Sequence, residues 1–404
     1  MKNKKIIYKN HIQKKYINTK YGNLKKNYLN IFKNIATNID NSKDTFHSLS
    51  KNFKFNFKLN DLKNFKKYSR VLIIGMGGSI LGSEAIYGFL EKKIKKEFLF
   101  FNNIDENKLY NLKKKIDLNK TLFIIISKSG NTIETLSNIL ALKVLKNNSK
   151  NIILISEKKD NALYLISKKM NLFHIEHKNY IGGRYSVLSE VGIVPASLMG
   201  INIVKLRKQL RTHLYSKNHN FLKESSIKIA NLIKNEKIKN LIFFNYVPEL
   251  DKFLYWCQQL IAESLGKKGK GFLPLISTAP KDHHSLLQLY LDGPKDKLFC
   301  IFSTDSDTNI RVNSSFMGKK FNFLNKKSLS QIKKAQKNSF LQVLKKKNIP
   351  YREIIIKDFS EETLGELFSY FILETAIVGK LLKIDPFDQP AVEQVKLYTK
   401  QNLK

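Results

Sequence analysis

The sequence predicts an α/β fold with two units, each a parallel sheet flanked by helices. Two series of short apolar runs carry this prediction, because strands buried on both faces of a parallel sheet are almost continuously apolar. The first series has four runs and the second has three: 71–75, 98–101, 122–126 and 151–156, then 240–244, 297–303 and 352–357. Helical patterns separate the runs, and such alternation is typical of a parallel sheet with helices on both faces.

The chain has 404 residues, which is enough for two or three domains of ordinary size. Its first 65 residues are rich in lysine, contain no proline and have helical rather than strand character. Helices are also expected over 251–265, 328–347 and 361–382. The predicted divisions are a helical N-terminal extension at 1–65, a first α/β unit at 66–203, a second at 204–384 and a C-terminal tail at 385–404.

The formal net charge of +39 raises the question of a nucleic-acid or membrane partner. Only six of the 72 basic residues are arginine, however, and arginine is the side chain suited to bidentate contacts with phosphates and bases. The lysines are scattered along the chain with many Asn and Ile residues, as a compositional bias of the genome would produce. We therefore expect no nucleic-acid partner, although the charge can attract an anionic substrate over a long range.

Several features favour a protein of the reducing cytoplasm. Cys257 and Cys300 lie in apolar surroundings without metal-ligand spacing, so neither a disulfide nor a metal site is expected. The N-terminus lacks the apolar core of a secretory signal and the Arg/Ser bias of a transit peptide. The most apolar long segment, 364–382, carries charged side chains that would be costly inside a bilayer, so we expect a core helix and no membrane span.

The turn after the apolar run 122–126 offers several groups that bind phosphate. Its hydroxyls belong to Ser127, Ser129 and Thr132. Lys128 supplies a cation, and Gly130 permits a sharp bend. The helix expected from about Asn131 presents unpaired backbone N–H groups, which favour an anion. A second interpretation stays open, in which Ser129 or Asn131 caps that helix and binds no ligand.

Two further glycine-rich turns are candidates for the same site. In GMGGSILG, at 75–82, Gly78 allows close backbone approach and Ser79 offers a hydroxyl. This is not the dinucleotide fingerprint, because Ile80 stands where a third glycine is needed. In GGRYS, at 182–186, Arg184 either clamps an anion or is an ordinary surface side chain. Tight packing explains the glycines of the first turn equally well.

Glu263 and a pair of histidines are the candidates for proton transfer. Glu263 lies near the C-terminal end of an expected helix, where the helix dipole disfavours a carboxylate, so a functional role competes with that of a solvated surface glutamate. His283 and His284 have no metal-ligand spacing, and a structural role is open for both. Histidine nevertheless moves protons near neutral pH, and His284 is the preferred candidate.

Six segments, taken in order, resemble the glucose-6-phosphate isomerase family, also called the phosphoglucose isomerase family. They are GMGGSILG, SKSGNTIET, GGRYS, AESLGKKGKGFLP, HHSLLQ and PFDQPAVEQVK, and they fall within residues 71–396. The resemblance implies two sugar isomerase (SIS) domains, which agrees with the two α/β units. It implies reversible aldose-ketose isomerisation of glucose 6-phosphate and fructose 6-phosphate through a cis-enediolate, in glycolysis and gluconeogenesis.

The resemblance also implies a role for each matching residue. The substrate phosphate would be held by Gly78, Ser79, Ser127, Lys128, Ser129 and Thr132. Glu263 would be the base, Arg184 would stabilise the enediolate, and Gln389 would orient the substrate. His284 and Lys396 would assist ring opening, with the histidine supplied by the neighbouring subunit of a homodimer. The substrate is a hexose phosphate, and the reaction requires no metal or other cofactor.

The chain departs from the family pattern at two places. Ala391 replaces a usual glycine, and Gln394 and Val395 replace a small or glycine-containing stretch just before Lys396. Two histidines stand where one is expected, and His284 is selected because Ser285 and Gln288 then fall in register. Two alternatives remain: a related isomerase that also accepts mannose 6-phosphate, and a sugar-phosphate-binding regulator without catalysis. The second would be expected to lack Glu263.

Overall fold

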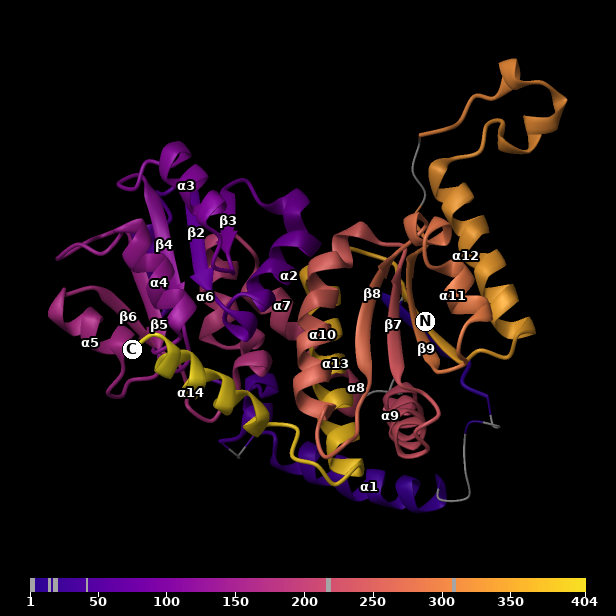
Figure 1. Cartoon of the computed structure of the whole chain (residues 1–404), viewed down its shortest axis with the longest axis horizontal. Coiled ribbons are helices and arrows are strands. Elements are labelled where there is room, and N and C mark those ends of the chain that lie inside the picture. Colours follow the sequence, from indigo (N-terminus) through magenta and orange to yellow (C-terminus); the bar gives the residue numbers. More distant parts are fainter. Residues whose placement is uncertain (1–3, 14–15, 17–20, 41–42, 216–218, 307–309) are drawn as a thin grey trace.

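The computed structural model describes residues 4–13, 16, 21–40, 43–215, 219–306 and 310–404, and within them it contains two five-stranded sheets (Figure 1). Each sheet corresponds to one of the two series of apolar runs. Helices flank both sheets, so the predicted α/β class is confirmed.

The first sheet is entirely parallel and has the strand order β3-β2-β4-β5-β6. Its strands are β2 (Arg70–Gly75), β3 (Glu97–Phe101), β4 (Thr121–Ile126), β5 (Ile152–Ser156) and β6 (Phe173–Glu176). Its helices are α2 (Leu81–Leu90), α3 (Glu106–Lys115), α4 (Ile133–Leu142), α5 (Ala162–Lys169) and α6 (Glu190–Leu198). Every residue of β4 is buried, as its apolar run predicts. The sequence does not predict the edge strand β6, because it has only four residues and just one of them, Ile175, is buried, so no apolar run marks it.

The second sheet has the strand order β1-β10-β9-β7-β8. Its strands are β1 (Ile6–Asn10), β7 (Asn240–Asn245), β8 (Leu273–Thr278), β9 (Lys297–Thr304) and β10 (Tyr351–Ile356). Its main helices are α9 (His219–Lys234), α10 (Asp251–Leu265), α11 (Leu287–Asp292), α12 (Leu329–Lys346) and α13 (Glu361–Leu381). The sequence does not predict β8, which contains Pro274 and lies at an edge, where a missing backbone donor is tolerated.

The N-terminal extension differs from the prediction of a purely helical segment. Its helix α1 (Tyr21–Asn38) packs against α9 and α13, but β1 pairs antiparallel with β10 and completes the second sheet. The run IIYKN is too short and too polar to be identified as a strand by itself. It is a strand because β10 offers it an open row of backbone donors and acceptors.

Helices α2 and α10 pack directly against one another and join the two units (Figure 1). Helix α13 lies behind α10, and nearly all of its residues are buried, which confirms a core helix. Its buried Glu374 accepts a hydrogen bond of 2.5 Å from Arg352. Among the described residues, no helix has the length and apolarity needed to cross a membrane.

His177, just after β6, links folding stability to pH. The side chain is 1% exposed, and burial lowers its pKa to about 4, below the ordinary value of 6.5. The unfolded chain therefore takes up this proton at a higher pH, so the stabilisation is complete above about pH 6.5 and is lost as pH falls towards about 4. The free energy of unfolding of wild type should fall between about pH 6.5 and pH 4, and we expect His177→Gln to make this fall smaller by on the order of 3 kcal/mol. Urea unfolding at several pH values measures it; the exposed His284→Gln is the control, and an unchanged pH dependence in His177→Gln would contradict the prediction.

Candidate active site

The site is built where turns of the first unit meet α10 of the second unit. Strands β2 and β4 are parallel neighbours with Gly75 opposite Ile126, so the turns that follow them lie at the same edge of the sheet. The first turn is the short helix η4 (Gly77–Ser79), which packs against a second short helix, η6 (Gly183–Leu188). Arg184 belongs to η6, and its guanidinium reaches α10. The structure therefore brings together three of the segments that the sequence singles out.

Glycine is required in η4 because neighbouring groups approach its backbone closely. A Cβ at Gly78 would lie 2.3 Å from the carbonyl carbon of Gly183 and 2.5 Å from the backbone nitrogen of Arg184. Gly77 has φ +51°, and a Cβ there would lie 2.6 Å from Nε2 of Gln259 on α10. This contact places the turn next to the helix that carries Glu263.

The turn after β4 keeps its hydroxyls at the expected edge. Ser127 Oγ and Thr132 Oγ1 are 2.8 Å apart, and the Gly130 N–H donates to Ser127 Oγ over 3.1 Å. Ser129 is exposed. Thr132, the N-cap residue of α4, makes no side-chain cap, and Asn131 Oδ1 accepts from the Ala162 N–H. Ser129 Oγ accepts from the Asn131 N–H over 3.3 Å just before the helix, so among the described residues neither Ser129 nor Asn131 caps α4 itself.

Lys128 points away from the hydroxyls of this turn. Its Nζ donates to the Asn179 carbonyl over 2.9 Å and lies 3.7 Å from Glu157 Oε1. Burial lowers the pKa of Lys128, and the nearby Glu157 carboxylate opposes this effect. In this arrangement the lysine contributes positive charge beside the turn and makes no direct contact with the hydroxyl groups.

Glu263 is held between two side chains on the last turns of α10. Its Oε1 accepts a hydrogen bond of 2.9 Å from Gln259 Nε2, and its Oε2 lies 3.3 Å from Arg184 Nη1. The side chain of Glu263 remains 30% exposed, whereas that of Arg184 is 3% exposed. A carboxylate that is fixed in direction and still reachable from solvent is suited to proton transfer.

The buried Arg184 connects this carboxylate to the C-terminal tail. Its Nη2 donates to the carbonyls of Pro386 and Asp388, and its Nη1 donates to Gln389 Oε1 over 3.3 Å. Its Nε donates to Ser264 Oγ over 2.8 Å. The first residues of the tail, Gln389 among them, therefore contact Arg184 beside Glu263.

Sequence reasoning misses three residues of this network: Gln259, Ser264 and Tyr185. Gln259 lies one helical turn before Glu263, which is the signal that would have found it. Tyr185 Oη lies 2.9 Å from Ser264 Oγ and donates to the Pro386 carbonyl over 3.1 Å. The last two residues lie next to predicted site residues, but only their tertiary contacts identify them.

Lys396 is not brought to Glu263 within the chain. It belongs to α14 (Glu393–Asn402), all of whose residues are exposed, and its Nζ donates to Glu393 Oε1 over 2.7 Å. Figure 1 shows α14 running past the first unit, away from the end of α10. The role of Lys396 in ring opening stays a prediction.

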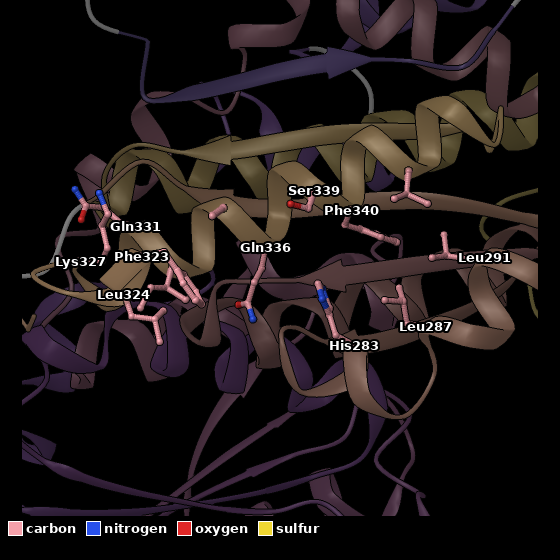
Figure 2. Close-up of a pocket in the computed structure, with 13 residues that line it drawn as sticks. His283, Leu287, Leu291, Phe323, Leu324, Lys327, Gln331, Gln336, Ser339 and Phe340 are labelled. Carbon is pink, nitrogen blue, oxygen red and sulfur yellow. The ribbon is translucent and has the colours of Figure 1, made fainter. Parts of the chain in front are cut away.

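The structure distinguishes the two adjacent histidines. His283 Nε2 lies 2.8 Å from Tyr246 Oη, and its ring stacks on Phe244 with centroids 5.6 Å apart. It lines a largely apolar hollow of about 770 Å³ between α11 and α12 (Figure 2), and burial lowers its pKa. His284 is exposed and makes no hydrogen bond or ion pair with any residue that the structure describes. His284 is thus the histidine that is available to a ligand or a second chain.

The side chains gathered here do not resemble a metal centre. In the portion of the chain that the structure describes, no group of three or more His, Cys, Asp or Glu side chains is placed to hold a metal ion. The groups gathered at the site are hydroxyls, backbone N–H groups, a carboxylate and a guanidinium.

The close approach at Gly78 gives a matched pair of variants. We expect Gly78→Ala to force η4 away from η6, to destabilise the fold by about 1–3 kcal/mol and to weaken sugar-phosphate binding. Gly183→Ala should change neither property, because a Cβ at Gly183 meets nothing within 4 Å. Thermal unfolding and ligand titration of both variants measure the effects. Equal behaviour of the two variants would contradict the prediction.

Comparison with known proteins identifies the family. Residues 25–404 match the family model of phosphoglucose isomerase. A probable glucose-6-phosphate isomerase of Methanococcus maripaludis is 34% identical over 86% of this chain and 81% of that protein. The glucose-6-phosphate isomerase of Methanocaldococcus jannaschii is 31% identical over 92% of each.

Two solved structures share the fold. A hypothetical protein of Thermus thermophilus has a TM-score of 0.81 at 22% identity, covering 98% of this chain and 99% of that chain. A glucose-6-phosphate isomerase of Chlamydia trachomatis has a TM-score of 0.78 at 18% identity, covering 99% of this chain and 88% of that one. Together with the family match, the fold and the gathered motifs lead to one conclusion: the chain belongs to the phosphoglucose isomerase family.

Proposed function

We propose that this chain interconverts glucose 6-phosphate and fructose 6-phosphate. The observation that carries the proposal is the placement of Glu263, which is fixed between Gln259 and Arg184 next to the glycine-rich turn of the first unit. Relatives that are about a third identical are named glucose-6-phosphate isomerases, and they match most of this chain. The reaction is a step of glycolysis and gluconeogenesis.

In the proposed reaction Glu263 takes a proton from C2 of the open-chain aldose. The electrons of that C–H bond form a C1=C2 double bond, and negative charge develops on the former carbonyl oxygen. The same carboxylate returns the proton to the adjacent C1, while the hydroxyl proton on O2 passes to O1, so that C2 becomes the carbonyl carbon of the ketose. General acid-base catalysis of this kind contributes about 10²- to 10⁴-fold to the rate.

Arg184 and the turns have the other roles. Arg184 stabilises the charge of the enediolate, and a preorganised donor of this kind is worth about 10²- to 10³-fold. The substrate phosphate lies on backbone and hydroxyl groups of the two turns: Gly78, Ser79, Ser127, Ser129 and Thr132. Lys128 adds a favourable charge from beside the turn, and Gln389 orients the sugar.

A coupled assay tests this function. Purified protein supplied with fructose 6-phosphate should form glucose 6-phosphate, measured by its oxidation with an added dehydrogenase. Folded protein without turnover would contradict the proposal, and retained sugar-phosphate binding would then indicate a regulator. The same assay with mannose 6-phosphate determines whether the specificity is broader.

The active form is proposed to be a homodimer with shared active sites. His284 is exposed and makes no hydrogen bond to the described residues of the Glu263 network in its own chain, whereas ring opening needs a proton donor close to the sugar. Helix α14 carries exposed apolar side chains, including Val395, Leu397 and Tyr398, that a second chain would cover. His284 of one chain, and Lys396, would then assist ring opening in the dimer.

Mixing two inactive variants tests the shared site. A mixed dimer of Glu263→Gln and His284→Asn chains has one site with both native residues. Unfolding and refolding the two together should restore about a quarter of wild-type activity, because about half of the dimers are mixed and each has one intact site. If both variants are inactive alone and the mixture also stays inactive, the histidine does not act across subunits.

Two further assignments are part of this proposal. The chain divides into an extension, two sugar isomerase domains and a tail at the boundaries predicted from the sequence. The location is the cytoplasm, in agreement with two cysteines that are both free and buried, Cys257 and Cys300.

A further inference from the structure

The second sheet repeats the strand arrangement that places the phosphate-binding turns in the first. In the first sheet, β2 has β3 on one side and β4 on the other; in the second, β7 has β8 on one side and β9 on the other. Each sheet therefore has one crevice where the strand order reverses, between β2 and β4 and between β7 and β9. In open parallel sheets, ligands bind outside the carboxyl ends of the strands at such a point.

The register of the strands makes the two crevices equivalent residue by residue. The last ladder pair is Gly75 with Ile126 in the first sheet and Asn245 with Phe302 in the second. Ser127 and Ser303 each come directly after this pair. The pattern Leu-Phe-x-Ile-x-Ser precedes both crevices, at 122–127 and at 298–303. Ser303 thus occupies in the second sheet the position that Ser127 occupies in the first.

A hollow of about 400 Å³ lies at the second crevice. One side of the hollow is the turn after β7, which corresponds to the turn after β2. The other side is formed by Ser303, Thr304 and Ser306 at the end of β9, which correspond to the turn after β4. Ser303 is 3% exposed, and its Oγ has no hydrogen-bond partner among the described residues. A buried hydroxyl without a partner is costly, so a ligand oxygen in the hollow would satisfy it. Thr304 Oγ1 and Ser306 Oγ, 3.0 Å apart, add two more hydroxyls.

The hollow is also positively charged. Four lysines line it against one carboxylate, that of Glu249, which lies 3.4 Å from Lys92. The other three lysines, Lys333, Lys334 and Lys337, come from the first turns of α12. Lys337 is 6% exposed, and its closest carboxylate oxygen is 4.0 Å away, on Glu353. Lys334 lies 3.7 Å from Asp305 Oδ1, whereas the half-buried Lys333 makes no ion pair with any residue that the structure describes.

We propose that this hollow is a second, non-catalytic site that binds a phosphate monoester through Ser303, Thr304 and Lys333. Its volume lies in the range of small-molecule sites. Pro248 and Glu249 stand where the first sheet has Gly78 and Ser79, so side chains rather than a close backbone hold the ligand. The site is separate from Glu263 and does not depend on the proposed isomerase activity.

Binding stoichiometry tests the proposal. Calorimetric titration of the Glu263→Gln chain with glucose 6-phosphate avoids turnover and should give two molecules per chain. Adding Ser303→Ala and Lys333→Ala should weaken one of the two sites by at least about tenfold, because charge-assisted hydrogen bonds to the phosphate are lost. Lys346→Ala, an exposed lysine near the other end of α12, is the matched control and should keep both sites.

The outcomes separate this site from the catalytic one. A second site that survives Ser303→Ala with Lys333→Ala, or a single site unaffected by them, would overturn the proposal. A single site that these changes abolish would support it and would contradict substrate binding at the first sheet. If inorganic phosphate binds in this hollow and glucose 6-phosphate does not, the assignment to a monoester is overturned. Thermal unfolding of each variant confirms that it is folded.

Discussion

Glu263→Gln is expected to lower the turnover number for fructose 6-phosphate by about 10²- to 10⁴-fold, because the amide cannot accept the proton that leaves C1 of the ketose. Glutamine has nearly the same shape and can still interact with both Gln259 and Arg184, so the helix end should be undisturbed. Affinity for sugar phosphate should remain, because the proposed phosphate contacts are on the turns of the first unit and do not involve Glu263. Steady-state kinetics and calorimetric titration measure the two quantities separately.

A control for this variant is available on the same helix. Gln259→Leu removes the hydrogen bond to Glu263 but leaves the carboxylate, so it should lower turnover less than Glu263→Gln does. Near wild-type turnover in Glu263→Gln would exclude Glu263 as the base. An equal loss in both variants would show that positioning, rather than proton transfer, accounts for the effect.

Arg184→Lys is expected to have the second largest effect, a loss of about 10²- to 10³-fold in turnover. Lysine keeps the positive charge, but it cannot hold Ser264, Glu263 and the tail carbonyls at the same time. Since the guanidinium is buried, the lost hydrogen bonds should also destabilise the fold. Kinetics together with thermal unfolding record both effects.

Lys267→Ala separates charge stabilisation from anchoring of the tail. Lys267 Nζ donates to the carbonyl and to Oδ1 of Asp388, both over 2.6 Å, without touching Glu263. Its loss should loosen the tail and raise KM while changing turnover far less than Arg184→Lys does. If the two variants lose turnover equally, Arg184 acts by holding the tail, and its role toward the enediolate would have to be abandoned.

The strands with strong local signals were predictable, and the weak ones were not. The long helices α10, α12 and α13 and the buried strands agree with the sequence patterns to within one or two residues. Strands β1, β6 and β8 are missed because each lies at the edge of a sheet and mixes apolar with polar residues or proline, whereas the edge strand β3 was predicted from its continuous apolar run. Backbone pairing with a distant segment leaves no local periodicity.

The same distinction applies to the candidate site. The sequence alone determined which residue types are present and in what order: the hydroxyl-rich turn, the glycines, Arg184 and Glu263. Tertiary structure decided their partners, since Gln259 and the tail reach Glu263 and Arg184 only after α10 packs beside η4. It also directed Lys128 towards Asn179, and sequestered His283 while leaving His284 exposed. Chemistry is carried by residue type and is therefore readable in the chain, whereas direction and burial depend on contacts between segments that are far apart in it.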